Sequence, residues 1–382
     1  MTQQSSWSMR GVALAAALTL AVAAVTGHRV GAAAEAEPSV SARSAILIEA
    51  ESEEPVFEQN ADERLPMAST TKIMTGLVAL STVPQDRVVE VSPEAVGVEG
   101  SSIYLTAGES ISMHDLVCAM MLESANDAAA AIAYEVAGGI DEFAAMMNER
   151  ARELGLSDTH FANPHGLDSP DHYTTARDLA RLAAAALRVP AFAEIVSTYK
   201  MNIDRDGEIR VLLNHNRLLR SYDSAIGVKT GFTKKSGRCL VSAAERDGIT
   251  MIAVTLNAPD DWRDHQSMLD YGFSQYERVT VAQPREVFTD LPLIGGVSPT
   301  VRCSNADSAS VVLPTGAKVT CRIEAARYAP APVRAGDALA KAVFVSGRKV
   351  VAELPLYAEH DVLLRDDKPT FFERLIEFIW GN

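Results

Sequence analysis

The chain has 382 residues, with 35 Lys and Arg against 50 Asp and Glu, giving a net charge of −15. This length allows two domains with their own cores, and the four cysteines are too few for a disulfide framework. The acidic balance, without any basic run, argues against a nucleic-acid partner.

The N-terminal segment has the pattern of a secretory signal. Arg10 precedes an apolar stretch at residues 11–25, and three small residues at 32–34 are followed by Glu35. We therefore expect residues 1–34 to be a signal peptide and the protein to be exported. An uncleaved anchor is the alternative, although the apolar stretch is short for a membrane span.

Ser69 and Lys72 form an S-x-x-K pattern between an extended stretch, residues 45–57, and an apolar helical pattern at 73–80. A helix beginning near Ser69 would place both side chains on one face and aim backbone N–H groups at whatever Ser69 attacks. Lysine is a base only when neutral, which requires a pKa about 3 units below its usual value of about 10.4. Burial and a second cation nearby would lower it.

The same pattern also occurs where no chemistry is expected. Ser197 and Ser346 each begin an S-x-x-K run, and neither is followed by suitable partner motifs. For an isolated S-x-x-K pattern the better interpretation is a helix N-cap at Ser69, with Lys72 as a solvated charge, and only the partner motifs reverse this preference.

Ser124 and Asn126 lie at a junction between two helical patterns, residues 113–122 and 127–135. Such a junction can project two polar side chains into a cleft. The alternative is a helix stop and restart in which one of the two is a cap.

Residues 158–172 read as a loop that contains His160, His165 and His172 beside three aspartates. Their spacing matches no H-E-x-x-H motif, so we expect hydrogen bonding within the loop and no metal.

Lys229, Thr230 and Gly231 end a short strand predicted at 226–230. A turn at 233–237 and strands at 239–244 and 249–256 follow, which indicates an antiparallel meander. Lys229 is then the candidate second cation, and Gly231 would allow substrate backbone to approach the strand closely. The alternative is a basic strand end before a hairpin.

Residues 284–365 alternate Val and Leu with Pro and Gly, which predicts a small β domain. Cys303 and Cys321 lie in neighbouring β segments there, and the sequence leaves their pairing open. Cys118 and Cys239 read as small core residues.

Residues 368–382 predict a short amphipathic helix. Its polar stripe is Glu373, Arg374 and Glu377, and its apolar residues are Phe371, Phe372, Leu375, Ile376, Phe378, Ile379 and Trp380. The segment is too short to span a bilayer, so we expect it to lie in the membrane interface. Docking onto its own domain is the alternative.

Taken in this order, the three motifs resemble those of the serine-type D-Ala-D-Ala carboxypeptidases, the low-molecular-mass penicillin-binding proteins of peptidase family S11. Four more segments share the likeness: residues 60–69, 163–168, 227–231 and 270–273. The resemblance implies an α+β fold. A serine β-lactamase/DD-peptidase-like catalytic domain at 40–279, with an antiparallel sheet flanked by helices, would precede the β domain.

The resemblance also implies the chemistry. Ser69 would attack the penultimate D-alanine carbonyl of a peptidoglycan stem peptide, Lys72 would take its proton, and Ser124 would relay a proton to the leaving D-alanine. The N–H groups of Ser69 and Phe232 would form the oxyanion hole.

Substrate binding is implied in the same way. Thr230 and Lys229 would meet the terminal carboxylate, and Asn126 would hold either the substrate amide or Lys72. No cofactor is expected, β-lactams would acylate Ser69, and the enzyme would work at the outer face of the cytoplasmic membrane or in the cell wall.

Three features depart from relatives or limit the interpretation. Ala125 stands where many relatives have glycine, and His215 stands where some use an arginine for the substrate carboxylate, which leaves His215, Arg217 and Arg263 as candidates. Residues 158–172 hold no glutamate to activate a deacylating water, so fast β-lactam hydrolysis is not expected. A slowly reacting penicillin sensor, an endopeptidase and a transpeptidase remain alternatives.

Overall fold

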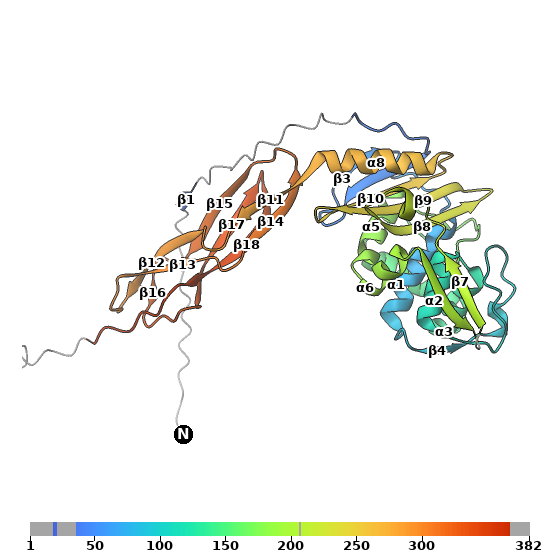
Figure 1. The fold of residues 1–382 in the computed structure, drawn as a ribbon, viewed down its shortest axis with the longest axis horizontal. Helices are drawn as coiled ribbons and strands as arrows, with labels where there is room; N and C mark the ends of the chain where they lie inside the picture. The colour runs from blue at the N-terminus through green and yellow to red at the C-terminus, as the bar shows by residue number, and fades with distance from the viewer. Residues whose placement is uncertain (1–17, 21–35, 206–207, 367–382) are drawn as a thin grey trace, which may run out of the picture. The chain divides into compact units, whose positions relative to one another are not determined.

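The computed structural model describes residues 18–20, 36–205 and 208–366. The chain forms two compact units, Gly31–Glu277 and a second composed of Met1–Val30 with Arg278–Asn382 (Figure 1). Each unit has its own hydrophobic core.

A five-stranded antiparallel sheet forms the framework of the first unit. Its order is β3 (Pro55–Gln59), β2 (Ser44–Glu49), β10 (Ile249–Leu256), β9 (Gly237–Arg246) and β8 (Ala225–Thr233). Strands from both ends of the unit's sequence thus share one sheet, and β8 is an edge strand. All six residues of β2 are buried, because the sheet is covered on both faces.

Helices lie on both sides of this sheet. α8 (Asp261–Gln275) packs on β10 and β9, while α5 (Ala176–Leu187) and α6 (Pro190–Ser197) pack on the opposite face (Figure 1). The predicted α+β fold, an antiparallel sheet flanked by helices, is confirmed.

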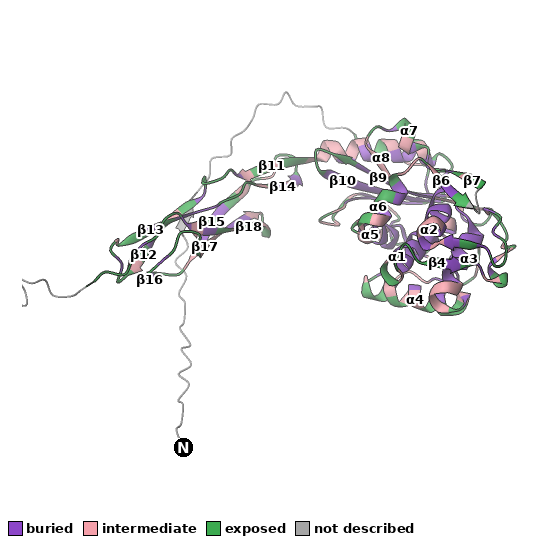
Figure 2. Ribbon diagram, turned by 60° about the horizontal axis from the view of Figure 1, so that its bottom comes forward, coloured by how far each residue is buried: buried purple, intermediate pink, exposed green. Residues whose placement is uncertain are grey.

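A cluster of four helices lies beside α5 and α6. It consists of α1 (Lys72–Thr82), α2 (Met113–Leu122), α3 (Asn126–Ala137) and α4 (Ile140–Glu153). The first eight residues of α1 are all buried, as expected for a helix that other helices surround (Figure 2). Ser112 caps α2 by accepting a hydrogen bond from the Asp115 N–H, which explains why this helix begins where the sequence predicted.

Short elements complete the unit. They are the 3₁₀ turns Ala68–Thr71 and Pro93–Ala95, the paired strands β4 (Val88–Glu90) and β5 (Ser110–Ser112), the hairpin of β6 (Lys200–Arg205) and β7 (Glu208–Leu213), and α7 (Leu218–Ser221).

The second unit is built from β-strands. Its main sheet has the order β1 (Leu18–Leu20), β15 (Val319–Ala325), β17 (Ala338–Ser346), β18 (Lys349–Ala358), β13 (Thr300–Ser304), β12 (Phe288–Ile294) and β16 (Ala329–Pro330). A two-stranded sheet pairs β11 (Tyr276–Ala282) with β14 (Ala309–Pro314). Only the pairing of β12 with β16 is parallel among those given for this sheet's described strands.

The order of strands in this sheet shows whether Cys303 and Cys321 can form a disulfide. β13 and β15 carry these two residues and are separated by β17 and β18, so their backbones lie roughly 14 Å apart at the usual strand spacing. A disulfide needs Cα atoms within about 7 Å. Both cysteines are free and buried.

Two predicted segments cannot be compared with the structure. The tail at 368–382 and nearly all of the leader at 1–34 lie outside the described residues. Within the described part, no helix combines the length and the apolar character needed to cross a membrane.

Candidate active site

Ser69 lies in the 3₁₀ turn Ala68–Thr71, which leads directly into α1 at Lys72. The prediction of a helix beginning near Ser69 was therefore nearly right, since the first turn is 3₁₀ rather than α. Lys72 Nζ lies 3.0 Å from Ser69 Oγ, so the two side chains meet as their spacing implied.

Lys72 has two further partners. Its Nζ lies 2.7 Å from Asn126 Oδ1 and 2.6 Å from the carbonyl oxygen of His165. Both are acceptors, so they take two N–H bonds from the amine. A neutral amine has two N–H groups and one lone pair, which leaves the lone pair for the Ser69 hydroxyl.

The environment of Lys72 favours this neutral form. The side chain is fully buried, and burial holds its pKa well below the usual value. Lys229 is also buried, with 1% of its surface exposed, and its positive charge lowers the pKa of Lys72 further. Burial also lowers the pKa of Lys229, to about 7.

Asn126 is fixed at both ends of its amide. Besides meeting Lys72, its Nδ2 donates to the Glu99 carbonyl at 2.5 Å, and its backbone N–H donates to the Ser101 carbonyl at 2.7 Å. Of its two predicted roles, the structure has Asn126 holding Lys72.

Ser124 precedes α3 with a backbone φ of 60°, a conformation that non-glycine residues rarely adopt. The Ser124 hydroxyl has no hydrogen-bond partner among the described residues, and the residue lines the same cavity as Ser69. A strained backbone that presents a free hydroxyl beside the nucleophile is typical of a functional position.

Gly231 brings strand β8 against the nucleophile turn. A Cβ at this position would lie 3.0 Å from the Ser69 nitrogen and 3.1 Å from the Met67 carbonyl oxygen. The absence of a Cβ therefore lets β8 approach the Ser69 turn, and the role of Gly231 in admitting substrate backbone stays a prediction. This contact places Thr230 and Phe232 beside Ser69.

A cavity of about 330 Å³ joins these elements. It is lined by Ser69, Ser101, Ser124, His215, Arg217, Thr230, Gly231, Phe232, Arg238, Asp261 and Trp262. The Ser69 turn, three loops, strands β8 and β9 and the start of α8 thus meet at one hollow, with Lys72, Asn126 and Lys229 buried behind it.

Comparison with known proteins gives the family. Residues 31–260 match the peptidase S11 family, D-alanyl-D-alanine carboxypeptidase. The chain is 31% identical to D-alanyl-D-alanine carboxypeptidase DacF of Bacillus subtilis, over 84% of this chain and 86% of the relative. It is also 31% identical to DacC of Escherichia coli, over 99% and 97%.

The chain belongs to the S11 D-alanyl-D-alanine carboxypeptidases. Among solved structures it is similar to penicillin binding protein 5 from Haemophilus influenzae, with a TM-score of 0.65, 26% identity and coverage of 86% of this chain and 99% of that one. It is therefore a serine-type D-Ala-D-Ala carboxypeptidase that acts on peptidoglycan, and β-lactam binding is expected for its family.

Four cavity residues of this carboxypeptidase were not predicted from the sequence: Ser101, Arg238, Asp261 and Trp262. Arg238 lies directly across the hairpin from Phe232 and pairs with Asp261 at 2.9 Å. Two guanidinium groups lie over the Trp262 ring, with the Arg217 Cζ at 5.9 Å and the Arg238 Cζ at 5.7 Å from its centroid.

The three predicted carboxylate-binding candidates differ in position. Arg263 is 82% exposed, pairs with Asp260, and is not among the cavity-lining residues. His215 lines the cavity, and its Nε2 lies 3.4 Å from Glu123 Oε2. Arg217 lines the cavity and has no carboxylate partner among the described residues.

The histidines of the 158–172 loop serve its internal structure. His172 Nδ1 accepts from the Ala162 N–H at 2.9 Å, and its Nε2 lies 2.6 Å from Thr71 Oγ1. Burial lowers the pKa of His172 to about 4 and that of His165 to about 3. Among the described residues, no three His, Cys, Asp or Glu side chains are placed to hold a metal ion.

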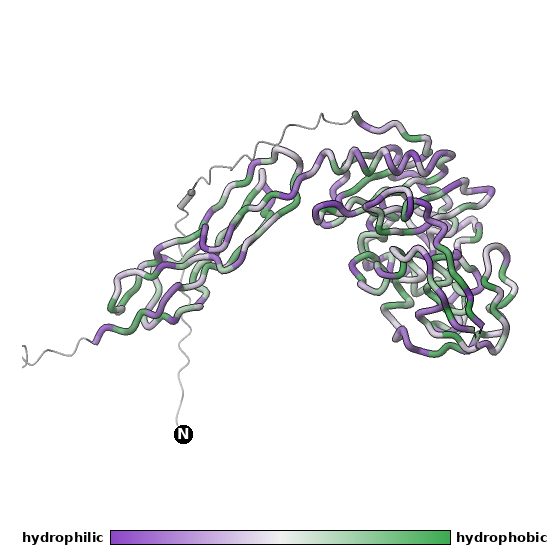
Figure 3. The backbone as a smooth tube through the Cα atoms, viewed as in Figure 1, coloured by the Kyte–Doolittle hydropathy of each residue, from purple (hydrophilic) through white to green (hydrophobic). Residues whose placement is uncertain are grey.

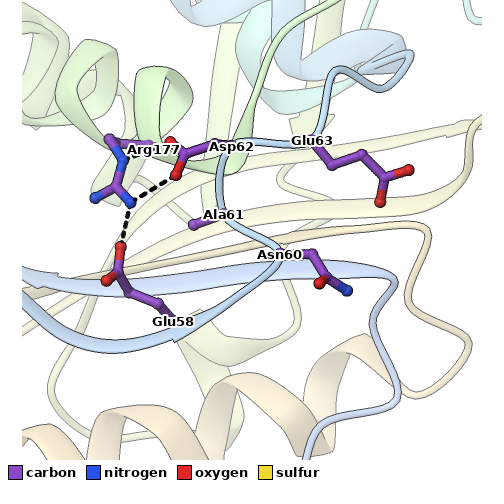
Figure 4. Close-up of a pocket in the computed structure, with 6 residues that line it drawn as sticks. All are labelled: Glu58, Asn60, Ala61, Asp62, Glu63 and Arg177. Atoms are coloured by element: carbon purple, nitrogen blue, oxygen red, sulfur yellow. Dashed lines mark hydrogen bonds and ion pairs between the residues drawn. The ribbon is translucent and has the colours of Figure 1, made fainter.

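A second hollow of the carboxypeptidase unit contains three acidic side chains, but its charges are satisfied internally. Arg177 donates to both oxygens of Asp62, at 2.6 and 3.0 Å, and pairs with Glu58 (Figure 4). Glu63 pairs with Arg43. The hollow therefore offers no unpaired charge to a ligand.

Proposed function

We propose that Ser69, Lys72 and Ser124 carry out acyl transfer on peptidoglycan stem peptides that end in D-Ala-D-Ala. The observation that carries this assignment is the hydrogen bonding of Lys72. Two of its bonds go to acceptors, and the third contact is the Ser69 hydroxyl at 3.0 Å. A neutral Lys72 can only accept a proton there, which makes Ser69 a nucleophile.

In the acylation step, Ser69 Oγ attacks the penultimate D-alanine carbonyl while its proton moves to Lys72. Negative charge develops on the carbonyl oxygen, and the backbone N–H groups of Ser69 and Phe232 stabilise it by donating hydrogen bonds to that oxygen. The approach of β8 to the Ser69 turn at Gly231 supports this pairing. The C–N bond then breaks and the leaving D-alanine amine takes a proton relayed by Ser124.

The substrate binds in extended form beside β8. Because β8 is the edge strand of its sheet, its free side can pair with a peptide backbone as an additional strand. Thr230 then donates to the terminal carboxylate, and the charges of Lys229 and Arg217 attract it. Asp261 pairs with Arg238, and the guanidinium groups of Arg238 and Arg217 both lie over the Trp262 ring. We take Trp262 to position Arg217 as the carboxylate clamp, the side chain that binds the substrate carboxylate.

Water completes the cycle by hydrolysing the acyl-enzyme. β-Lactams acylate Ser69 in the same way, and the loop at 158–172 offers no glutamate for their rapid release. The enzyme is therefore a target of penicillin rather than a penicillinase.

The compartment follows from the substrate. Peptidoglycan lies outside the cytoplasm, so we place the enzyme at the outer face of the cytoplasmic membrane. Residues 1–34 serve as its export signal and residues 368–382 as an interfacial anchor, on the sequence patterns alone.

The deciding experiment measures D-alanine release from a peptide ending in Lys-D-Ala-D-Ala. Ser69→Ala abolishes both release and covalent penicillin labelling, with the fold intact. Ser197→Ala is the matched control, because Ser197 begins the same S-x-x-K pattern but donates only to the Glu194 carbonyl at 3.0 Å. Labelling that survives in Ser69→Ala contradicts the assignment, and labelling without release indicates a sensor or a transpeptidase.

A further inference from the structure

The β unit exposes four large apolar side chains at one end. Ile294, Val297, Leu363 and Leu364 are 55%, 58%, 66% and 59% exposed, and we call them the tip patch. Single exposed apolar residues are common on soluble proteins, but neighbouring ones that form a patch mark an interaction surface.

Backbone contacts bring the tip patch together from two distant parts of the chain. The Val297 N–H donates to the Leu363 carbonyl at 3.0 Å, and Gly296 forms a β-bridge with Leu364. Ile294 ends β12, two residues before this bridge. The patch is therefore held by a hydrogen-bonded framework.

An aromatic residue lies close to the patch. Tyr328, 53% exposed, directly precedes β16, and β16 pairs in parallel with the end of β12 through Ile294 and Pro330. A tyrosine has an apolar ring and a polar hydroxyl, the combination enriched where protein meets the lipid headgroup region.

The tip patch is close in sequence to the apolar C-terminal segment, and this indicates the kind of surface that the patch contacts. Leu364 is three residues before the segment 367–382, whose structure is not described and whose sequence holds three Phe, two Ile, one Leu and one Trp. Figure 3 shows hydrophobic segments at the end of the β unit from which the chain runs on into this segment. Two apolar elements thus adjoin at one end of the unit.

We propose that the tip patch docks onto the surface of a phospholipid bilayer, with its side chains at the boundary between headgroups and acyl chains. A fluid apolar phase needs no shaped groove, and this patch is assembled from a strand end, a turn and an extended segment. The β unit then contacts the membrane through its own surface as well as through the tail. This inference does not depend on the catalytic roles proposed above.

The test compares two pairs of substitutions in the protein exported from the full-length gene. Leu363→Ser with Leu364→Ser alters the tip, and Phe288→Ser with Val350→Ser is the control, because those side chains are 47% and 46% exposed near the start of β12 and of β18. Binding is measured by sedimentation with vesicles of phosphatidylethanolamine and phosphatidylglycerol. We expect the tip pair to weaken binding roughly tenfold or more, while the control pair binds like the unmodified protein.

Direct insertion is read from a tryptophan placed in the patch. Both tryptophans are introduced in a Trp380→Phe background, because Trp380 lies in the segment proposed to contact the membrane. Vesicles with brominated acyl chains quench the fluorescence that Leu364→Trp adds, whereas they do not quench the fluorescence that Val350→Trp adds. D-Alanine release from a soluble peptide stays unchanged in all these variants, which separates failure of docking from failure of the enzyme.

Two results overturn the proposal. If the tip pair binds vesicles as tightly as the unmodified protein, the tail alone holds the membrane. If, without vesicles, the emission of Trp380 differs between the tip pair and the unmodified protein, the tail packs on the tip patch and covers it.

Discussion

Lys229 and Lys72 are both fully buried, and the charge of Lys229 lowers the pKa of Lys72. Two buried lysines near one another are unfavourable for folding, because burial disfavours each ammonium and the two repel. The arrangement makes chemical sense when one lysine has to be a base and the other a source of positive potential. The active site therefore carries a stability cost that the reaction requires.

Lys229→Met is expected to abolish penicillin labelling and yet raise the free energy of unfolding. Methionine fills a similar volume without a buried charge, so we expect a gain of about 1–3 kcal/mol in the free energy of unfolding. Chemical denaturation and penicillin labelling measure the two effects. Lys234→Met, at an exposed position, is the control and leaves both unchanged.

The same variant has a predicted pH signature. The pKa of Lys229 is about 7 in the folded protein and about 10.4 in the unfolded chain, so between these values the unfolded state binds more protons. Stability therefore rises as the pH increases from about 7 to about 10, and Lys229→Met reduces this slope. An equal slope in both proteins would show that Lys229 is not the depressed group.

Asn126→Asp is expected to move the pH dependence of acylation. The new carboxylate would lie where Asn126 Oδ1 now lies, 2.7 Å from Lys72 Nζ, and would stabilise the ammonium. The pKa of Lys72 then rises, so the acidic limb of the penicillin acylation rate shifts to higher pH. Asn126→Ala lacks the charge and should lower the rate without this upward shift, and identical profiles would exclude the proposed role.

Much of the framework was predictable from local patterns. Helix 113–122 and strand 249–256 have the predicted bounds, because a cap or a turn marks their ends and apolar spacing marks their length. The turn at 233–237 places Arg238 opposite Phe232, although no sequence pattern indicates a role for an arginine at this position.

The remaining features depend on contacts between distant segments. Trp262 and Asp261 reach the cavity only because α8 packs on β9, and no local pattern reports that packing. Likewise, the Glu99 carbonyl that orients Asn126 lies 27 residues away in an irregular loop. Residues of this kind become candidates only once the fold is known.

The proposed carboxylate clamp gives a fourth prediction. Arg217→Ala is expected to raise KM for the D-Ala-D-Ala peptide by roughly tenfold or more, because it removes the charge that we propose binds the substrate carboxylate. Arg263→Ala, 82% exposed and outside the cavity lining, is the control and should leave KM unchanged. Steady-state D-alanine release measures both. If only Arg238→Ala raises KM, the clamp is Arg238 and Arg217 supports it.

Gly166 gives the last prediction, because it lies against the backbone that carries the nucleophile. Its φ is 90°, and a Cβ there would lie 2.0 Å from the Ala68 carbonyl oxygen and 2.9 Å from the Ser69 nitrogen. Gly166→Ala must therefore displace the Ser69 turn, which should lower the penicillin acylation rate by about a hundredfold or more.

Gly108→Ala separates this displacement from simple backbone strain. Gly108 has a φ of 80°, but a Cβ there would meet nothing within 4 Å. Both variants should lose about 1–2 kcal/mol of stability from the left-handed conformation, while only Gly166→Ala loses acylation. If the two variants lose acylation equally, the contact between Gly166 and the Ser69 turn does not position the nucleophile.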